Sequence, residues 1–172
     1  MAASSKTHIF CLDDHRTFAE DLKKRFSDTT RYEVTVSHNE DDLLKLFSGE
    51  KSKKVCKIVI IGIHDSKDNY QVTDELISRI RTTNPETGIL LVVSPERMEE
   101  ASKQLRFNVD SFIPRNSNMV LRVHNAVKKH ISEHNLKIYR KRRNISLLVF
   151  FIFLAFSLVV LFIARFKFPH YF

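Results

Sequence analysis

The sequence predicts an α/β fold, a doubly wound five-stranded parallel sheet with helices on both faces, followed by one C-terminal transmembrane helix. Segments rich in β-branched residues alternate with amphipathic segments, which indicates repeated strand–helix units. Residues 57–63 and 89–94 each contain an unbroken apolar run, and such strands need cover on both faces, as in the middle of a parallel sheet. A third apolar run, from Ile145 to Ala164, is long enough to cross a bilayer.

Strands and helices are expected in alternation along the first domain. The first helix has Phe18, Leu22 and Phe26 on one face, at the spacing of an amphipathic helix. Asn39 is placed to cap the second helix and Gly49 to end it. The expected strands are residues 7–12, 32–36, 57–63, 89–94 and a segment within 107–113, and the expected helices are residues 17–26, 40–49, 72–81, 96–105 and a helix from about residue 117.

The run from Ile145 to Ala164 has no charged residue, and only Ser146 and Ser157 are polar. At ~1.5 Å per residue, a helix of this length matches the ~30 Å hydrocarbon core of a bilayer. A buried core helix is the alternative, but core helices usually keep a polar face. No Pro or Gly lies between Met119 and Arg143, so the fifth helix is expected to continue into the span.

Positive charge gathers beside this apolar run. The net charge is +8, from 28 Lys and Arg against 20 Asp and Glu, and no acidic residue follows Glu133. A basic cluster precedes the run and outweighs Arg165 and Lys167 after it, so the N-terminal domain is expected on the cytoplasmic side, with the cluster touching anionic lipid. No aromatic platform or Gly-rich basic motif is present, and no nucleic-acid partner is expected. The cluster consists of Arg140, Lys141, Arg142 and Arg143.

Three further features indicate neither secretion nor a cysteine or histidine metal site. No apolar segment follows Met1 to Lys6, so no secretory signal peptide is expected. Cys11 and Cys56 lie in or beside strands without metal-ligand spacing and are expected to be buried, reduced thiols. His130 and His134 are four residues apart on a basic helix, where a solvated face is the expected state rather than a metal site.

Several segments resemble the receiver domains of response regulators, and they follow one another along the chain in the order that this family has. Hydrophobic residues followed by Asp13 and Asp14 resemble the first strand of that family, and Ser94 occupies its hydroxyl position after the fourth strand. Phe112, within residues 109–113, stands at the aromatic switch position. Residues 58–64 are similar to the third strand, and the resemblance covers residues 7–131. It implies a CheY-like, flavodoxin-like fold.

The resemblance also implies a chemistry. Receiver domains accept a phosphoryl group from a histidine kinase on an aspartate that ends the third strand. Their acidic pair binds Mg²⁺, and a hydroxyl and a lysine hold the product. This transfer needs a nucleophile, a metal and a cation arranged together.

This sequence departs from the family at the residues that carry the chemistry. The aspartate position is Gly62, and the lysine position is Arg115. Arg115 is expected to pair with Asp13 or Asp14, which leaves at most a weak Mg²⁺ site on those two carboxylates. A simpler alternative is that Asp13 or Asp14 caps the first helix and that Ser94 caps the fourth helix.

The expected function is that of a membrane-anchored pseudo-receiver, a protein-interaction and signalling module that is not an enzyme and needs no cofactor. Its partner would be a histidine kinase, another receiver or a membrane complex. Two alternatives remain: a phospho-accepting receiver that uses Asp65, in the loop that also holds Asp68, and a structural subunit of a membrane assembly. Phosphoprotein labelling separates the first alternative from the pseudo-receiver.

The fifth helix is also expected to form a homodimer. A row of apolar residues lies along one side of it at a spacing near 3.5, and Ile131 and Ile138 are expected to extend beyond the sheet, uncovered. The row consists of Val120, Val123, Val127, Ile131 and Ile138. The expected organisation is an N-terminal tail (1–6), a receiver-like domain (7–131), a basic juxtamembrane helix (132–144), a transmembrane helix (145–164) and a short tail (165–172).

Overall fold

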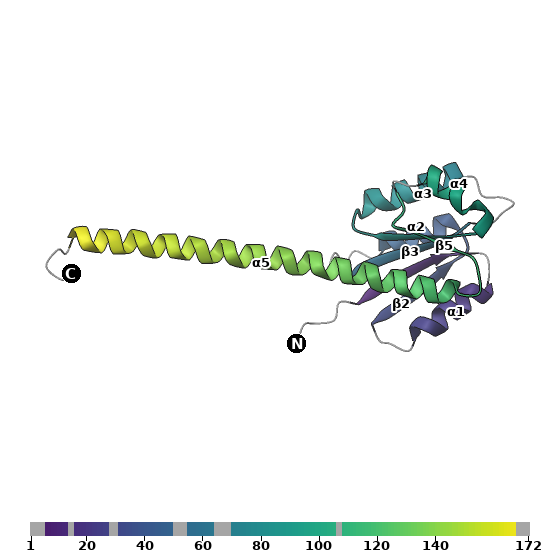
Figure 1. The fold of residues 1–172 in the computed structure, drawn as a ribbon, viewed down its shortest axis with the longest axis horizontal. Coiled ribbons are helices and arrows are strands. Elements are labelled where there is room, and N and C mark those ends of the chain that lie inside the picture. Colours follow the sequence, from purple (N-terminus) through teal and green to yellow (C-terminus); the bar gives the residue numbers. More distant parts are fainter. Residues whose placement is uncertain are drawn as a thin grey trace. The chain divides into compact units, whose positions relative to one another are not determined.

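The structure is a computed structural model that describes residues 6–13, 16–27, 31–49, 55–63, 70–105 and 108–167, with side chains as far as residue 160 except those of Arg16 and Ser27. The chain divides into two compact units, Met1–Ser132 and Glu133–Phe172. The first unit holds the sheet and the second holds most of the last helix (Figure 1).

The first unit is built on a five-stranded parallel sheet, which confirms the predicted fold class. The strand order is β2-β1-β3-β4-β5, so β3 lies in the middle and β2 at an edge. Each strand pairs in parallel with its neighbours, and the continuous apolar runs are buried along their whole length in β4 and almost to the end of β3. The strands are β1 (Thr7–Leu12), β2 (Tyr32–Ser37), β3 (Cys56–Gly62), β4 (Gly88–Val93) and β5 (Ser111–Pro114).

Helices connect the strands, as predicted, with differences at their ends. The third helix begins at Tyr70, two residues before the prediction, and the fifth at Met119. The predicted fourth helix is divided, because Pro95 opens a 3₁₀ turn before the α-helix starts. The helices are α1 (Arg16–Ser27), α2 (Glu40–Gly49), α3 (Tyr70–Thr83), the 3₁₀ helix η1 (Pro95–Arg97), α4 (Met98–Gln104) and α5 (Met119–Lys167).

Two hydrophobic cores cover the two faces of the sheet. On one face, α1 and α5 pack through Phe18, Leu22 and Val127 against the inward side chains of the strands. On the other, α2, α3 and α4 pack through residues such as Phe47 and Ile77 (Figure 1). Alternate residues of each central strand serve opposite cores, which explains why those strands have no polar face.

Three predictions about α5 were wrong. Ile131 was expected beyond the sheet, but it is partly buried and packs against the core between the sheet, α1 and α5. His130 and His134 were expected on a solvated face, yet His134 is buried and the His130 ring packs against β4. A Cβ atom on Gly88 would lie 2.7 Å from that ring. Val123, Val127, His130 and His134 follow one another at helical spacing, so the buried stripe of α5 runs farther than its apolar residues indicate.

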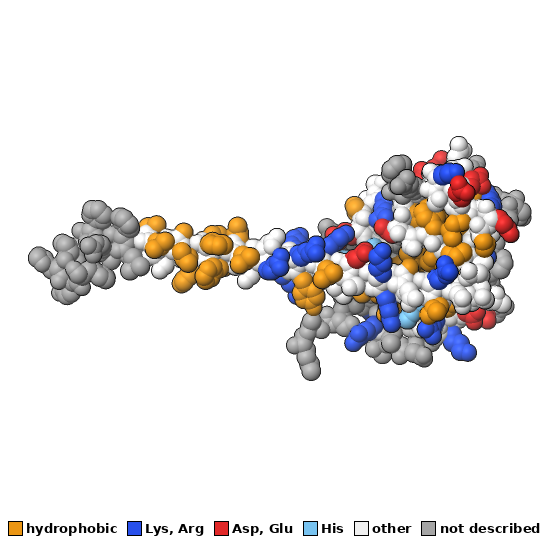
Figure 2. Space-filling view, viewed as in Figure 1, with side chains coloured by type: hydrophobic (Ala, Val, Ile, Leu, Met, Phe, Trp, Pro, Cys, Tyr) orange, Lys and Arg blue, Asp and Glu red, His pale blue; other side chains and the backbone are white. Residues whose placement is uncertain are grey.

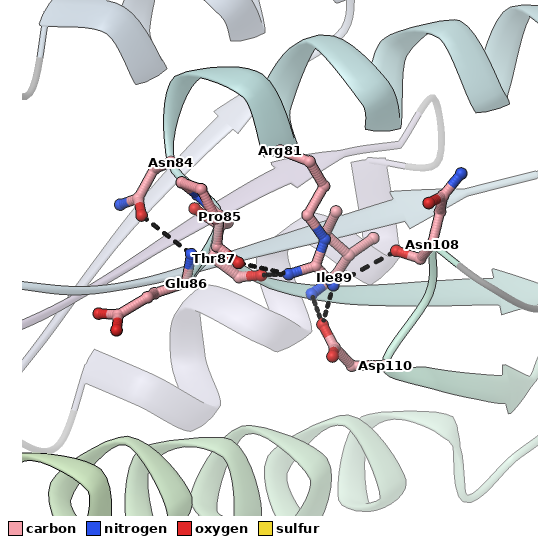
Figure 3. Close-up of polar contacts among 8 residues, drawn as sticks. All are labelled: Arg81, Asn84, Pro85, Glu86, Thr87, Ile89, Asn108 and Asp110. Atoms are coloured by element: carbon pink, nitrogen blue, oxygen red, sulfur yellow. Dashed lines mark hydrogen bonds and ion pairs between the residues drawn. The ribbon is translucent and has the colours of Figure 1, made fainter.

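The side chain of Arg81, in α3, contacts the segments that lead into β4 and β5, at the edge where the strands of the sheet begin (Figure 3). Its guanidinium donates to the carbonyl oxygens of Pro85 at 3.0 Å and Thr87 at 2.7 Å, and to Asp110 Oδ2 at 2.8 Å. The same carboxylate oxygen accepts the backbone N–H of Ile89 at 2.7 Å. One side chain thus ties the turn before β4 to the segment before β5.

Replacing Arg81 by methionine is expected to lower the free energy of unfolding by about 2 kcal/mol, because a half-exposed guanidinium loses charge-assisted hydrogen bonds and leaves carbonyl groups unsatisfied. Arg79 lies on the exposed face of the same helix, and Arg79→Met should change stability by less than about 0.5 kcal/mol. Urea denaturation followed by far-UV circular dichroism measures both. Equal effects of the two variants would contradict the role of the Arg81 network.

The second unit consists of the remainder of α5. Its apolar side chains from Ile145 to Val160 are exposed in the structure, as are the basic side chains from Arg140 to Arg143. Among the described residues, α5 is the one helix that is long and apolar enough to cross a membrane by length and composition.

Candidate functional site

The candidate site lies where the central strands end at the carboxyl edge of the sheet. Asp13 follows β1, Gly62 ends β3, Ser94 follows β4 and Arg115 follows β5. Backbone hydrogen bonds keep these ends in register: Ile63 N donates to Val92 O at 2.8 Å, and Arg115 N donates to Val93 O at 2.8 Å. Parallel strands bring residues far apart in the sequence together at this edge.

Asp13 and Arg115 form an ion pair across the site. Arg115 Nη2 donates to Asp13 Oδ2 at 2.8 Å, so the predicted pairing is found, with Asp13 as the partner. The Asp13 side chain is fully buried, whereas that of Arg115 is 20% exposed. Arg115 Nε is buried and has no hydrogen-bond partner among the described residues. A buried carboxylate needs such a cation, because desolvation of an unpaired charge is costly.

The ion pair fills the space above Gly62. A Cβ atom on Gly62 would collide with Asp13 Oδ2, and it would lie 2.7 Å from Asp13 Cγ and 2.8 Å from Arg115 Nη2. A side chain at this position would therefore force Asp13 or Arg115 to shift. The site in this state has no room for a side chain at the end of β3.

The other predicted residues lie in different surroundings. Ser94 is nearly buried and is the N-cap residue of η1, but its side chain makes no capping hydrogen bond, so the capping prediction was wrong in that respect. Phe112 is partly buried against the core on the face of the sheet that α2, α3 and α4 cover. Asp14, Asp65 and Asp68 lie outside the described residues.

Two contacts near the site were not predicted. The His38 ring, just after β2, has Nδ1 3.2 Å from the carbonyl oxygen of Asp13. Tyr70, at the start of α3, lies under the guanidinium of Arg97, with the cation 4.8 Å from the ring centroid. Its hydroxyl lies 3.4 Å from Glu100 Oε2, and burial, opposed by Arg97, raises the pKa of Tyr70. The position of His38 at the end of a strand could have indicated its contact from the sequence. The contact of Tyr70 with Arg97 could not have been predicted, because no sequence pattern links the two segments.

The described residues contain no group of three or more His, Cys, Asp or Glu side chains that could hold a metal ion. Of the predicted pair of carboxylates, Asp13 is described, and its Oδ2 atom is occupied by Arg115. The two cysteines are buried and form no disulfide, as predicted.

No protein-family model and no curated protein matches the sequence. Solved structures do. A response regulator receiver domain from Clostridium thermocellum matches with a TM-score of 0.61 at 15% identity, over 76% of this chain and 98% of its own. A CheY-like receiver domain from Methanospirillum hungatei gives 0.61 at 16% identity, over 77% and 99%.

A response regulator from Burkholderia pseudomallei, determined with a phosphorylated aspartic acid, a calcium ion and citrate, gives a TM-score of 0.53 at 23% identity, over 77% of this chain and 72% of its own. Structural matches at sequence identities this low show a common fold and nothing finer. The strand order, the two helical layers and these matches together show that the first unit has the CheY-like receiver fold of response regulators.

Proposed function

We propose that this chain is a membrane-anchored pseudo-receiver, a signalling module that binds other proteins without being phosphorylated. The observation that carries the proposal is the Asp13–Arg115 ion pair packed directly against Gly62. A phosphoryl acceptor at the end of β3 would need a carboxylate side chain in the space that this pair fills.

The proposal follows from what the transfer requires. Phosphoryl transfer depends on a nucleophile, a metal ion that neutralises charge, and a cation that holds the product. Gly62 supplies no nucleophile, and the cation Arg115 already neutralises Asp13 inside the protein. Binding of Mg²⁺ to Asp13 would have to displace that guanidinium, so any magnesium binding is expected to be weak.

The anchor in this proposal is the apolar part of α5. The stretch from Ile145 onward has the length and composition of a single span, and Arg140 to Arg143 lie on its N-terminal flank. The positive-inside rule then places the receiver-fold unit in the cytoplasm. A histidine kinase, another receiver or a membrane complex would be the protein partner.

The proposal also includes a homodimer through α5. Val123 and Val127 are fully buried in the first unit, and Ile131 is partly covered, so these residues are not available for a second copy. Val120 is partly buried against the same core, which leaves Ile138, also partly buried, as the last member of the predicted row.

Incubation of the full chain with acetyl phosphate and Mg²⁺ should leave its mass unchanged, because no nucleophile is present at the end of β3. Intact-mass spectrometry measures this, with a phosphorylatable receiver domain treated in parallel. A single phosphoryl adduct that disappears in Asp65→Asn would replace the pseudo-receiver by the phospho-accepting alternative.

Protease added to sealed, right-side-out cells should spare the receiver-fold unit, because the cluster Arg140 to Arg143 holds it in the cytoplasm. Replacing the four residues by glutamine should expose the unit to digestion in part of the molecules. Digestion of the unaltered protein would refute the orientation. Co-purification with fixed partners in detergent would instead favour the structural-subunit alternative.

A further inference from the structure

The second unit carries a dense group of basic side chains directly before its apolar stretch. Arg140, Lys141, Arg142 and Arg143 occupy one turn of α5, and Lys137 lies about one turn earlier. Figure 2 shows basic side chains on α5 next to the exposed hydrophobic ones. All five are exposed, and none of them forms an ion pair with another described residue. These cations are therefore available to an anion from outside the chain.

Three of the five form a row along one side of the helix, called here the cationic row. Lys137, Arg140 and Arg143 follow one another at intervals of three residues, and residues three apart are neighbours on a helix surface, with Cβ atoms about 5–6 Å apart. Arg142 lies away from the row, about 160° around the helix from Arg140, because each residue turns the helix by about 100°. The row therefore suits a ligand that carries several anionic groups along the helix axis.

The cationic row reaches beyond the headgroup layer of an ordinary bilayer. The hydrocarbon boundary falls at Ile145, where the apolar stretch begins. Along the helix axis, Arg143 then lies ~3 Å above the boundary, Arg140 ~7.5 Å and Lys137 ~12 Å, and an average tilt of about 20° shortens these heights by only about 6%. The headgroup layer is only about 5–8 Å thick on each side. Helical side chains lean toward the N-terminus, here away from the hydrocarbon, so Lys137 lies above the phosphates of ordinary phospholipids.

Headgroup chemistry decides which lipid can engage the whole row. A phosphorylated inositol ring carries phosphomonoester groups above the phosphodiester of its lipid, whereas phosphatidylserine carries its charge within the layer. We infer that the cationic row is a docking surface for lipids with multiply phosphorylated headgroups. The row and the apolar stretch belong to the same unit, so their spacing does not depend on where the first unit lies. The inference rests on the anchor in the proposed function, and it commits to lipid rather than to an acidic protein.

The test measures which lipids gather around the purified full chain. The sequence has no tryptophan, so Tyr139→Trp, at an exposed position beside the row, provides a single fluorescent reporter. The chain is reconstituted in phosphatidylcholine vesicles with a small, equal fraction of phosphatidylinositol 4,5-bisphosphate or phosphatidylserine, each labelled with the same acceptor dye on an acyl chain. Energy transfer from the tryptophan, relative to that with labelled phosphatidylcholine, gives the enrichment of each lipid.

The phosphoinositide should be enriched over phosphatidylserine, and Lys137 should account for part of that preference. One basic residue near an anionic group strengthens attraction about fivefold, so Lys137→Gln should lower the ratio of the two enrichments about fivefold. The matched control, Arg142→Gln, removes the same charge nearer the hydrocarbon but outside the row, and it should lower the ratio by less than about twofold. Attraction by net charge alone predicts the reverse order, because Arg142 lies closer to the lipid.

A ratio near one in the parent chain, or a ratio that falls as far in Arg142→Gln as in Lys137→Gln, would overturn the inference. No enrichment of either lipid would also overturn it and leave an acidic protein as the alternative occupant. Flotation with vesicles of phosphatidylcholine alone tests the anchor separately, because it requires insertion and no anionic lipid. A chain that fails to float refutes the anchor, whereas one that floats without enriching the phosphoinositide refutes only the lipid site.

Discussion

Replacing Arg115 by methionine should lower the free energy of unfolding by about 3 kcal/mol. The substitution keeps much of the side-chain volume but leaves the Asp13 carboxylate, which is fully buried, without its cation. Removing one partner of a buried ion pair typically costs 3–5 kcal/mol, and the partial exposure of Arg115 favours the lower end, about 3 kcal/mol. Urea denaturation of the detergent-solubilised chain, followed by far-UV circular dichroism, measures the loss.

The matched control removes both charges. Asp13→Asn together with Arg115→Met leaves no unpaired buried charge, so the double variant should be more stable than Arg115→Met alone by at least about 1 kcal/mol. If the double variant is as unstable as the sum of the two single variants, the residues do not interact, and the ion pair does not hold the site closed.

Restoring an aspartate at the end of β3 should damage the protein rather than restore a receiver. In Gly62→Asp the new side chain meets Asp13 and the Arg115 guanidinium at once and places a second carboxylate beside a buried one. Overpacking costs about 1–3 kcal/mol and a crowded like charge adds to it, so a loss of about 3–5 kcal/mol is expected. Acetyl phosphate should add no phosphoryl group to the variant.

Gly62→Ala separates the two causes, because it brings the Cβ atom without the charge and should lose only about 1–3 kcal/mol. A Gly62→Asp protein that is as stable as the parent and accepts a phosphoryl group would show that Arg115 moves aside readily. The departure from receiver chemistry would then rest on one residue rather than on a rebuilt site.

The residues around Gly62 show how the carboxyl edge of this receiver fold is held together. The strands that build the carboxyl edge are held by two apolar cores, and neither core depends on an acceptor aspartate. An arginine after β5 reaches Asp13 with its guanidinium, whose planar, permanently charged group differs from the point charge of a lysine. The ion pair therefore neutralises the buried Asp13 carboxylate from within the protein.

The amino-acid sequence by itself was sufficient for the α/β class, for five strands in the right places and for the apolar segment of α5. Period and composition carry this information locally: β3 and β4 are unbroken apolar runs because both of their faces are covered. The resemblance to receiver domains selected Asp13, Ser94 and Arg115 as site residues, and the structure places Asp13 and Arg115 against Gly62.

Tertiary structure decided which of these residues meet and which side chains are buried. The choice of Asp13 as the partner of Arg115 depends on distances between segments about a hundred residues apart, which no local pattern encodes. The burial of His134 and the packing of His130 against Gly88 contradict the polarity of their residue type, because a helix buries whatever side chains lie on its inward stripe. Ile131 is covered for the same reason: the core against α5 extends to it, and only the packed structure shows where that core ends.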